Sequence, residues 1–537
     1  MPRLPSVGGD DGNWGTILNS YLAQEHNTDG SHKKHAVTDT GGQVYNVKAF
    51  GAMGNGTTDD TTSIINTLTA CASGGVVYLP PGTYLISNTI NITNNNVTLM
   101  GAGAGATTIK AAAGSEGLAM IIVGNGTDTL AHTTIAKILF TSQNQKTANQ
   151  AIKLQKAFKT WIYNVRIEKQ YNGIFAFNST ETFFRDSDIR DTTNDAIVWE
   201  NALQSGYDFY INNVVADNPE VTNTGNGISW LGGENFVIQN CDFLHFKDGF
   251  HIHPATSHHT RFGFFINAEF DFASDNNINI NNTDGGDIIG LTFTNTWTGT
   301  ATNYGVLISD NGSGEIQGIR FIGHKSFHNG LAGFRLAGGD DIHLLGCDVV
   351  GNSQTSANTR SGIELSAGVG SNCSIVGCKS GNGFQQGNTQ SYGINIDGSH
   401  TYTNINISSN ELDNNTNGGI NLNDAVIAEG KIVNNTGRLV NQVFEAGTPE
   451  IWLTNTTTNH TSKILDDGNL HIEGENQNIW INGATNANVL LATGGGKVGI
   501  GNDNPGSKLS ITGLPTSAAG LSAGDVWNNN GVLNIVS

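Results

Sequence analysis

Two carboxylates, Asp242 and Glu269, each follow a short motif made of an apolar residue, any residue, a turn former and a small residue. The next two copies of the motif are followed by Trp297 and Lys325. If successive copies stack as adjacent strands, about 4.8 Å apart, these four side chains line one ridge. Carboxylates about 5 Å apart suit a glycosidase that retains configuration, and about 10 Å favours inversion. We predict Asp242 and Glu269 as catalytic, with Asp188 as a third candidate.

The ridge supplies the other groups that such chemistry needs. A shared negative field raises the pKa of one carboxyl group, which can then donate a proton. Trp297 could stack on a sugar ring, and Lys325 could bind a charged substrate. An exposed acidic face explains any single carboxylate equally well, so both interpretations stay open.

Histidines form a second cluster, because five of the 15 histidines fall between His245 and His259. His251 and His253 are two residues apart, so they share one face of a strand. Arg261 follows and could pair with the carboxylate of a uronate or sialate. We predict these three as substrate-binding residues. Spacing fixes no third metal ligand, so no metal site is predicted, and a plain surface loop is the alternative.

Two motifs alternate through eleven copies and predict the scaffold. One is Gly or Asn followed by apolar, any and apolar residues, as in Gly249–Ile252, and its copies start roughly 22 to 32 residues apart. The other is the motif before the ridge. Period-two alternation between polar breaks marks short strands, and stacked coils bury what one coil cannot. The chain is therefore predicted to be all-β, a parallel β-helix; an antiparallel sandwich is the alternative.

Two further features complete the expected solenoid. The small residue that ends each second motif should stack inward at a bend, as Val214, Cys241 and Ala268 would. Residues 57–68 are expected to form one amphipathic helix with an acidic first turn. Such a helix could cap the exposed first coil.

Residues 44–110 carry a recognisable series of motifs: Val47–Ala52, Asn55–Thr61, Gly75–Leu85 and Val97–Gly101. This series resembles the entry segment of the pectate-lyase superfamily, which implies a right-handed, single-stranded β-helix. The polygalacturonase branch of that superfamily uses Asn-Thr-Asp, Asp-Asp and Gly-His-Gly. The chain has Asp340-Asp341 and Asn194-Asp195 but no Gly-His-Gly, so that mechanism is not carried over.

Both ends of the chain resemble phage tail proteins. The N-terminal signals are Asp10–Gly15 and Glu25–Asn27; the C-terminal ones are Lys497–Gly501, Asn504-Pro505, Gly513–Thr516 and Asp525–Trp527. The resemblance implies a homotrimer attached to a tail or baseplate protein. We predict an attachment segment at 1–43, the β-helix at 44–440 and a β-rich shaft or tip at 441–537.

Composition excludes several classes of protein. Gly at 70 against only 9 Pro argues against collagen and against a disordered Pro-rich linker. A net charge of −20 makes a nucleic-acid surface unexpected. The chain has no run of apolar residues long enough for a membrane span, and its N-terminus lacks the apolar core of a secretion signal. We predict that the cysteines are small, buried hydrophobic residues.

The sequence therefore predicts a phage-type tailspike on a virion or phage-like particle, acting outside the cell. It would bind a bacterial surface polysaccharide and cleave it as a hydrolase or lyase. No cofactor is expected, although a lyase could use Ca2+. A non-catalytic adhesin and a free polysaccharide lyase are the alternatives.

Overall fold

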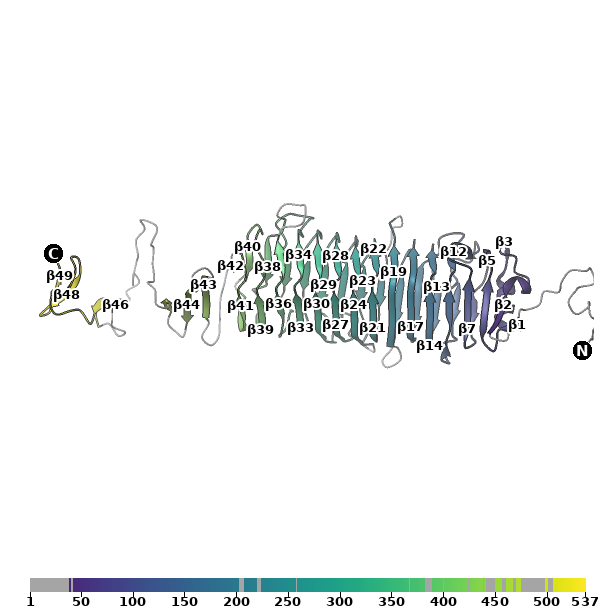
Figure 1. Ribbon diagram of the computed structural model, residues 1–537, viewed down its shortest axis with the longest axis horizontal. Coiled ribbons are helices and arrows are strands. Elements are labelled where there is room, and N and C mark those ends of the chain that lie inside the picture. The colour runs from purple at the N-terminus through teal and green to yellow at the C-terminus, as the bar shows by residue number, and fades with distance from the viewer. Residues whose placement is uncertain are drawn as a thin grey trace, which may run out of the picture. The chain divides into compact units, whose positions relative to one another are not determined.

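The computed structural model is a right-handed parallel solenoid of about 13 turns, and its coils follow one another in chain order (Figure 1). The all-β fold predicted from the repeats is confirmed. The structure describes residues 38–39, 42–201, 207–219, 224–256, 258–366, 368–381, 389–398, 400–423, 425–437, 439–440, 450–455, 460–466, 470–474, 498–500 and 506–537. The chain divides into two compact units, Met1–Ala446 and Gly447–Ser537.

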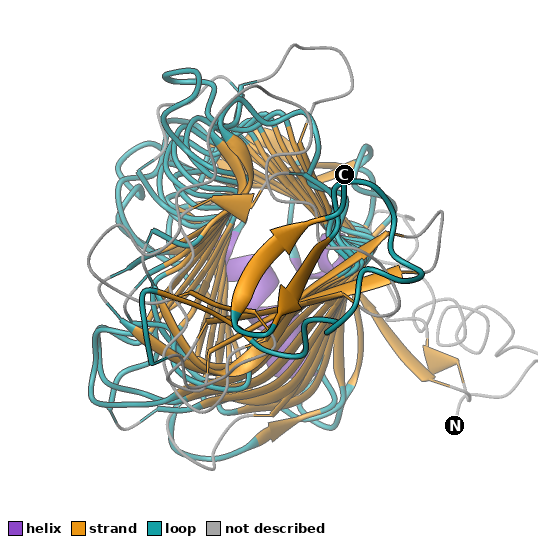
Figure 2. Ribbon diagram, turned by 90° about the vertical axis from the view of Figure 1, so that its left-hand side faces the viewer, coloured by secondary structure: helices purple, strands orange, loops and turns teal. Residues whose placement is uncertain are grey.

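Each full coil contributes strands to three faces of the solenoid, as the end-on view shows (Figure 2). The first face consists of β2 (Gly42–Asn46), β4 (Gly75–Leu79), β7 (Val97–Gly101), β11 (Thr134–Ala136), β14 (Ala157–Tyr163), β17 (Thr180–Arg190), β19 (Tyr207–Asp217), β21 (Gly233–Gln239), β24 (Thr260–Ile266), β27 (Ile288–Thr294), β30 (Ile316–Ile322), β33 (Asp340–Leu345), β36 (Ser374–Val376), β39 (Thr401–Ser408) and β41 (Val426–Val433). Two short strands flank it, β1 (Thr38–Asp39) and β10 (Leu130–Ala131).

The second face is joined to the first in one 28-stranded sheet, because β17 and β19 run through both. Its other strands are β3 (Asn55–Asp59), β5 (Gly82–Ile86), β8 (Thr107–Ala111), β12 (Leu139–Ser142), β15 (Arg166–Glu168), β22 (Asp242–Leu244), β25 (Glu269–Asp271), β28 (Trp297–Gly299), β31 (Lys325–Phe327), β34 (Asp348–Val350) and β37 (Lys379–Gly381).

The third face is a separate 14-stranded sheet. It consists of β6 (Ile90–Ile92), β9 (Ile121–Val123), β13 (Gln150–Gln155), β16 (Asn172–Phe177), β18 (Ile197–Glu200), β20 (Ile228–Trp230), β23 (Phe250–Ile252), β26 (Ile278–Asn281), β29 (Val306–Ser309), β32 (Phe334–Leu336), β35 (Ile363–Leu365), β38 (Tyr392–Ile396), β40 (Gly418–Asn421) and β42 (Leu439–Val440).

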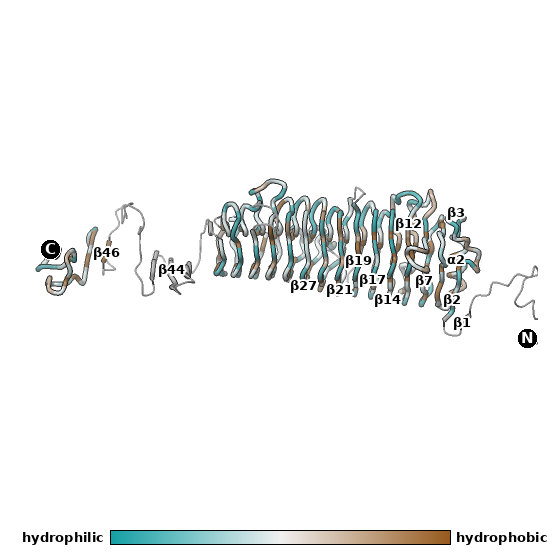
Figure 3. The backbone as a smooth tube through the Cα atoms, turned by 45° about the horizontal axis from the view of Figure 1, so that its top comes forward, coloured by the Kyte–Doolittle hydropathy of each residue, from teal (hydrophilic) through white to brown (hydrophobic). Residues whose placement is uncertain are grey.

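The interior is one continuous column of apolar side chains, and hydrophobic and hydrophilic residues alternate along the coils (Figure 3). Like residues stack on like: the rings of Phe265, Phe293 and Phe321 lie parallel on three successive coils, with centroids 4.1 and 4.5 Å apart. The small residues predicted to point inward are buried, including Val214, Cys241 and Ala268. Equivalent positions of the repeat therefore stack on one another in the interior, as the spacing predicts.

The bend between the first and second faces explains much of the Asn and Gly content. Its turn former has a positive φ in all eleven copies: Asn164, Asp186, Asn213, Asn240, Asn267, Asn295, Gly323, Gly346, Gly377, Ser409 and Asn434. Gly, Asn and Asp tolerate this left-handed conformation better than other residues. The outward amides also bond along the stack, because Asn267 Nδ2 donates to Asn240 Oδ1 at 3.2 Å.

Replacing Asn267 by alanine should lower the free energy of unfolding by about 1–2 kcal/mol, because alanine is strained at a φ of 51°. Glycine at the same position should cost only a few tenths of a kcal/mol, since it accepts that φ and loses only an exposed hydrogen bond. Denaturant unfolding of the two variants measures the difference. Equal losses in both would contradict the backbone explanation.

His324 occupies the inward position of its bend and is completely buried. Its ring nitrogens lie 2.7 Å from Thr296 Oγ1 and 3.1 Å from Thr298 Oγ1. Burial lowers the pKa of His324 from its usual 6.5 to about 3. The folded protein therefore holds this histidine neutral.

Acid should destabilise the fold through His324. Between pH 6.5 and 3 the unfolded chain binds a proton at this residue that the folded chain does not, so stability is full above pH 6.5 and falls as the pH drops. The contribution is about 1.4 kcal/mol per pH unit. His324→Thr, which places the Thr296 residue type at this bend, should make the free energy of unfolding less dependent on pH by that slope. An unchanged slope would show that folded His324 is charged.

The N-terminal cap differs in extent from its prediction. The helix α2 (Thr61–Ala70) follows the 3-10 turn η1 (Val47–Phe50) and buries Ile64 and Leu68. In the end-on view the helix lies across the end of the solenoid (Figure 2). Residues 57–59 were expected within the helix, but they belong to β3, which pairs with β5 on the second face. The acidic first turn is also wrong, because the Asp60 carboxylate instead accepts hydrogen bonds from Met53 N and Gly54 N.

The second unit is also built from strands. These are β43 (Glu450–Asn455), β44 (His460–Asp466) and β45 (Leu470–Gly474) in one antiparallel sheet, β46 (Val498–Ile500) with β47 (Leu509–Ile511), and β48 (Val526–Asn529) with β49 (Val532–Ile535). The motifs Asp10–Gly15, Glu25–Asn27 and Asn504-Pro505, with most of 1–43, lie outside the described residues. Within the described ranges, α2 is too short to cross a bilayer and no other helix has the length or apolar character to do so.

Candidate active site

The acid ridge, which we define as Asp242, Glu269, Asp271 and Trp297, lies on the outer side of the second face. Strand pairing places Asp242 directly beside Glu269 on the next coil, and Glu269 beside Trp297. Lys325 follows in the same column. The predicted order along the column, Asp242, Glu269, Trp297 and then Lys325, is confirmed by strand pairing. Adjacent positions are about 4.8 Å apart, so the two carboxylates face the same small volume.

Burial and crowding hold the ridge carboxyl groups toward their neutral forms. Burial, followed by the charges of Asp242 and Asp271, raises the pKa of Glu269 from its usual 4.5 to about 7. Burial also raises the pKa of Asp242. The pKa of Asp271 is raised by burial against opposing hydrogen bonds from Phe272 N, Thr300 and Trp297. Glu269 is therefore partly protonated near neutral pH, which suits a general acid.

Aromatic surfaces flank the carboxylates. Trp297 is 38% exposed and Phe272 is 46% exposed, whereas ring residues of this size are usually buried. Phe272 has a φ of 56°, a strained conformation for a bulky residue, which turns its ring outward at the bend after Asp271. The ring of Phe272 stacks on His245 at 4.8 Å. Exposed rings beside carboxylates are suited to holding a sugar.

The other ridge candidates are less closely placed. Asp188 lies in the same column, but Val215 separates it from Asp242, so it is about 10 Å away. Asp188 therefore shares the column but is not adjacent to Asp242 or Glu269. Lys325 is exposed, one coil beyond Trp297, and its next neighbour is Asp348. The catalytic and binding roles of these residues remain predictions.

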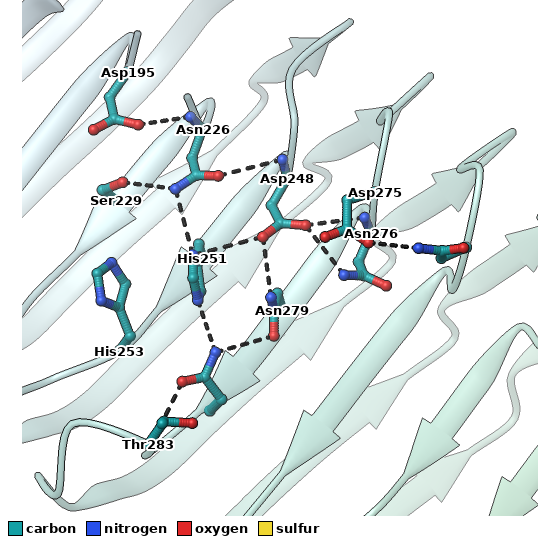
Figure 4. Close-up of polar contacts among 12 residues, drawn as sticks. Asp195, Asn226, Ser229, Asp248, His251, His253, Asp275, Asn276, Asn279 and Thr283 are labelled. Carbon is teal, nitrogen blue, oxygen red and sulfur yellow. Dashed lines mark hydrogen bonds and ion pairs between the residues drawn. The ribbon is translucent and has the colours of Figure 1, made fainter. Parts of the chain in front are cut away.

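His251, on β23 of the third face, lies in a buried polar network rather than in an open groove (Figure 4). Its Nε2 accepts a hydrogen bond from Asn281 Nδ2 at 2.7 Å, and its Nδ1 lies 3.5 Å from Asp248 Oδ2. Burial, with the nearby charges of His253 and Lys247, lowers the pKa of His251 to about 3. Both ring nitrogens have protein partners, so His251 positions its neighbours as a neutral group.

The other two predicted binding residues are also engaged. His253 Nδ1 lies 3.1 Å from Asp284 Oδ2, and its ring is 4.2 Å from that of His251. The Arg261 guanidinium lies 3.8 Å from Glu234 and 3.6 Å from Asp287. A substrate carboxylate would therefore compete with these two protein carboxylates for Arg261. In the described ranges, no group of three or more His, Cys, Asp or Glu side chains is arranged to hold a metal ion.

Sequence reasoning missed two carboxylates. Asp271 follows Glu269 by two residues, so period-two alternation places both on the outer face and could have revealed it. Asp248, in the bend before β23, accepts hydrogen bonds from Asn276 N and Asn279 Nδ2 at 2.9 and 3.0 Å. Burial raises its pKa. No spacing rule signalled Asp248, because its partners come from the next coil.

The fold is that of the pectate-lyase-like parallel β-helix proteins. Residues 44–251 match the family model for rhamnogalacturonase A/epimerase, pectate lyase-like. The β-helix fold and this match support the pectate-lyase superfamily that the motifs at the entry segment implied. The matched range includes Asp242 and ends before Glu269, so it contains only part of the acid ridge.

Curated relatives match a short stretch. Mannuronan C5-epimerase AlgE6 of Azotobacter vinelandii is 46% identical over 79 residues, and alginate lyase 7 of the same organism is 47% identical over 74 residues. These stretches cover 13% and 12% of this chain. The chain spans only 9% of the length of each of these relatives.

Solved structures share the fold. Bacteriophage phi29 gene product 12, in its pre-mature form, aligns with a TM-score of 0.53 at 14% identity, over 74% of this chain and 56% of that one. The A-module of AlgE6 from Azotobacter vinelandii aligns with a TM-score of 0.46 at 19% identity, over 75% of this chain and all of that one. At this identity the likeness to gene product 12 shows the fold alone.

Proposed function

We propose that this protein is a phage-type tailspike that binds a bacterial surface polysaccharide and hydrolyses its glycosidic bonds at the acid ridge. One observation carries the catalytic part: Glu269, with a pKa raised to about 7, lies beside Asp242 on the adjacent coil. Exposed Trp297 is next in the column and supplies a surface for the sugar.

The ridge has the parts of a retaining glycosidase. Protonated Glu269 donates its proton to the glycosidic oxygen as the bond from that oxygen to the anomeric carbon breaks. The Asp242 carboxylate, about 5 Å away, attacks the anomeric carbon and forms a glycosyl ester. Glu269, now ionised, takes a proton from water as the water oxygen attacks the anomeric carbon, and the bond from that carbon to the Asp242 carboxylate breaks. Asp271 keeps the local field negative and so supports the raised pKa of Glu269.

The tailspike role rests on the two tail-like ends of the sequence and on the solenoid between them. A homotrimer would cover part of the long solenoid surface, and an N-terminal segment would attach it to a tail or baseplate protein on the virion. The outward columns of a solenoid suit a long polymer, because each coil repeats the same spacing along one axis. The curated relatives named for mannuronan and alginate chemistry support a polysaccharide as the substrate class.

Incubation with capsules and exopolysaccharides of candidate hosts tests the proposal. New reducing ends without ultraviolet absorbance indicate hydrolysis, as proposed. Absorbance from an unsaturated uronate would indicate a lyase and would overturn the ridge mechanism. Binding to the host glycan without any product would make the protein an adhesin. Sedimentation measures the trimer independently.

A further inference from the structure

A serine, a histidine and an aspartate are linked in series on the outer side of the first face. His343 Nδ1 lies 2.5 Å from Ser374 Oγ, and His343 Nε2 lies 2.7 Å from Asp341 Oδ1. His343 on β33 and Ser374 on β36 are direct neighbours in register. All three side chains are partly exposed. A serine, a histidine and an aspartate in series also activate the serine hydroxyl of serine hydrolases, where the serine contacts Nε2 and the aspartate Nδ1; here the two ring nitrogens exchange these roles.

The aspartate is oriented independently of the histidine. Arg320 Nη2 donates to Asp341 Oδ2 at 3.1 Å, which leaves Oδ1 for the imidazole. Asp341 lies two residues before His343 on the same strand, β33, and has a φ of 53°, a left-handed conformation that Asp tolerates better than most residues. The ionised carboxylate favours a proton on Nε2, which leaves Nδ1 as the acceptor of the Ser374 proton.

We propose that Ser374, His343 and Asp341 form a second active site, which hydrolyses small carboxylic esters carried on sugar hydroxyls. Ser374 Oγ attacks the ester carbonyl carbon while His343 takes the serine proton. The imidazolium returns this proton to the sugar oxygen as its bond to the acyl carbon breaks. Water, deprotonated by His343, then attacks the acyl-serine, and the products are a carboxylic acid and free Ser374.

The surroundings favour a small acyl group on a large polar alcohol. Leu345 and Val376 lie two residues beyond His343 and Ser374 on the same outer face, and both are partly exposed. They offer apolar surface against which a short acyl chain can pack. On the other flank lie Asn372 and Asn404, whose amides are exposed and suit sugar hydroxyls. The face is open, so a polymer can cross it.

The oxyanion would have to be stabilised by a side chain. Backbone N–H groups of the first face bond to neighbouring coils, so they are not free to point at a substrate. Asn406 is the next residue in register after Ser374, and its Oδ1 is buried without a hydrogen-bond partner among the described residues. Its register beside Ser374 makes the Asn406 side-chain amide the N–H donor that we assign to the ester oxygen. One side-chain donor suits an ester better than the less reactive amide bond.

Ester hydrolysis is measured with full-length protein and p-nitrophenyl acetate, followed by acetate release from an acetylated polysaccharide. Ser374→Ala should lower kcat/KM at least 1000-fold, and Asp341→Asn about 100-fold or more. Ser371→Ala and Asp340→Asn are matched controls that should retain activity. Ser371 Oγ bonds to Asp340 rather than to a histidine, and Asp340 is the sequence neighbour of the proposed aspartate.

A fluorophosphonate probe gives a second readout, which does not depend on the acyl substrate. We expect one adduct per chain, located on Ser374 by mass spectrometry, and its loss in His343→Gln. Unchanged melting temperatures of the variants would show that lost activity is not lost folding. Activity that survives Ser374→Ala, or the absence of both hydrolysis and labelling, would overturn the proposal. Glycosidic cleavage at the acid ridge is scored separately, so either site can fail without the other.

Discussion

Exchanging Glu269 for glutamine is expected to reduce cleavage of the host polysaccharide at least 1000-fold in kcat. The amide keeps the size of the side chain but cannot donate a proton to the glycosidic oxygen. Asp242→Asn should cause a comparable loss, because an amide oxygen cannot form the glycosyl ester. Production of reducing ends measures both variants.

Asp348→Asn is the matched control, since Asp348 lies in the same outward column but beyond Trp297 and Lys325. It should keep nearly full activity. The pH dependence of kcat gives a second test. Because the pKa of Glu269 is about 7, the fraction of protonated general acid falls as the pH rises through 7, and kcat should fall with it. Full activity in Glu269→Gln, or a rate that rises through pH 7, would remove Glu269 from the mechanism.

Replacing Phe293 by alanine is expected to lower the free energy of unfolding by about 3–5 kcal/mol. Phe293 is completely buried, and its ring lies between those of Phe265 and Phe321 on the adjacent coils. Alanine would leave a cavity and remove two ring contacts at once. The solenoid cannot close that gap easily, because the backbone spacing is held by strand pairing on all three faces.

Phe264→Ala provides the control on the neighbouring strand β24. Its ring points outward and is 45% exposed, so its removal should change the free energy of unfolding by no more than about 0.5 kcal/mol. Denaturant unfolding of the two variants compares the inner and outer sides of the same face. Similar losses for both would mean that the apolar column is not the main source of stability.

The sequence alone determined the solenoid and the order of residues along its ridge. Alternation with period two assigns each side chain to one side of a strand, and one-to-one stacking converts equal motif positions into neighbours. Hence Asp242, Glu269, Trp297 and Lys325 could be placed in one column before any coordinates were known. The same rule, applied two residues further, would have added Asp271.

Only the tertiary structure decided what surrounds each of these side chains. The boundary between β3 and α2 follows from pairing with β5, which local helix preference does not include. The buried network of His251 and the Ser374–His343–Asp341 series depend on how the side chains are oriented, which spacing does not specify. The raised pKa of Glu269 likewise depends on burial, which sequence spacing does not measure. Spacing predicts which side chains are neighbours along a column, whereas their chemistry depends on how those side chains are oriented and buried.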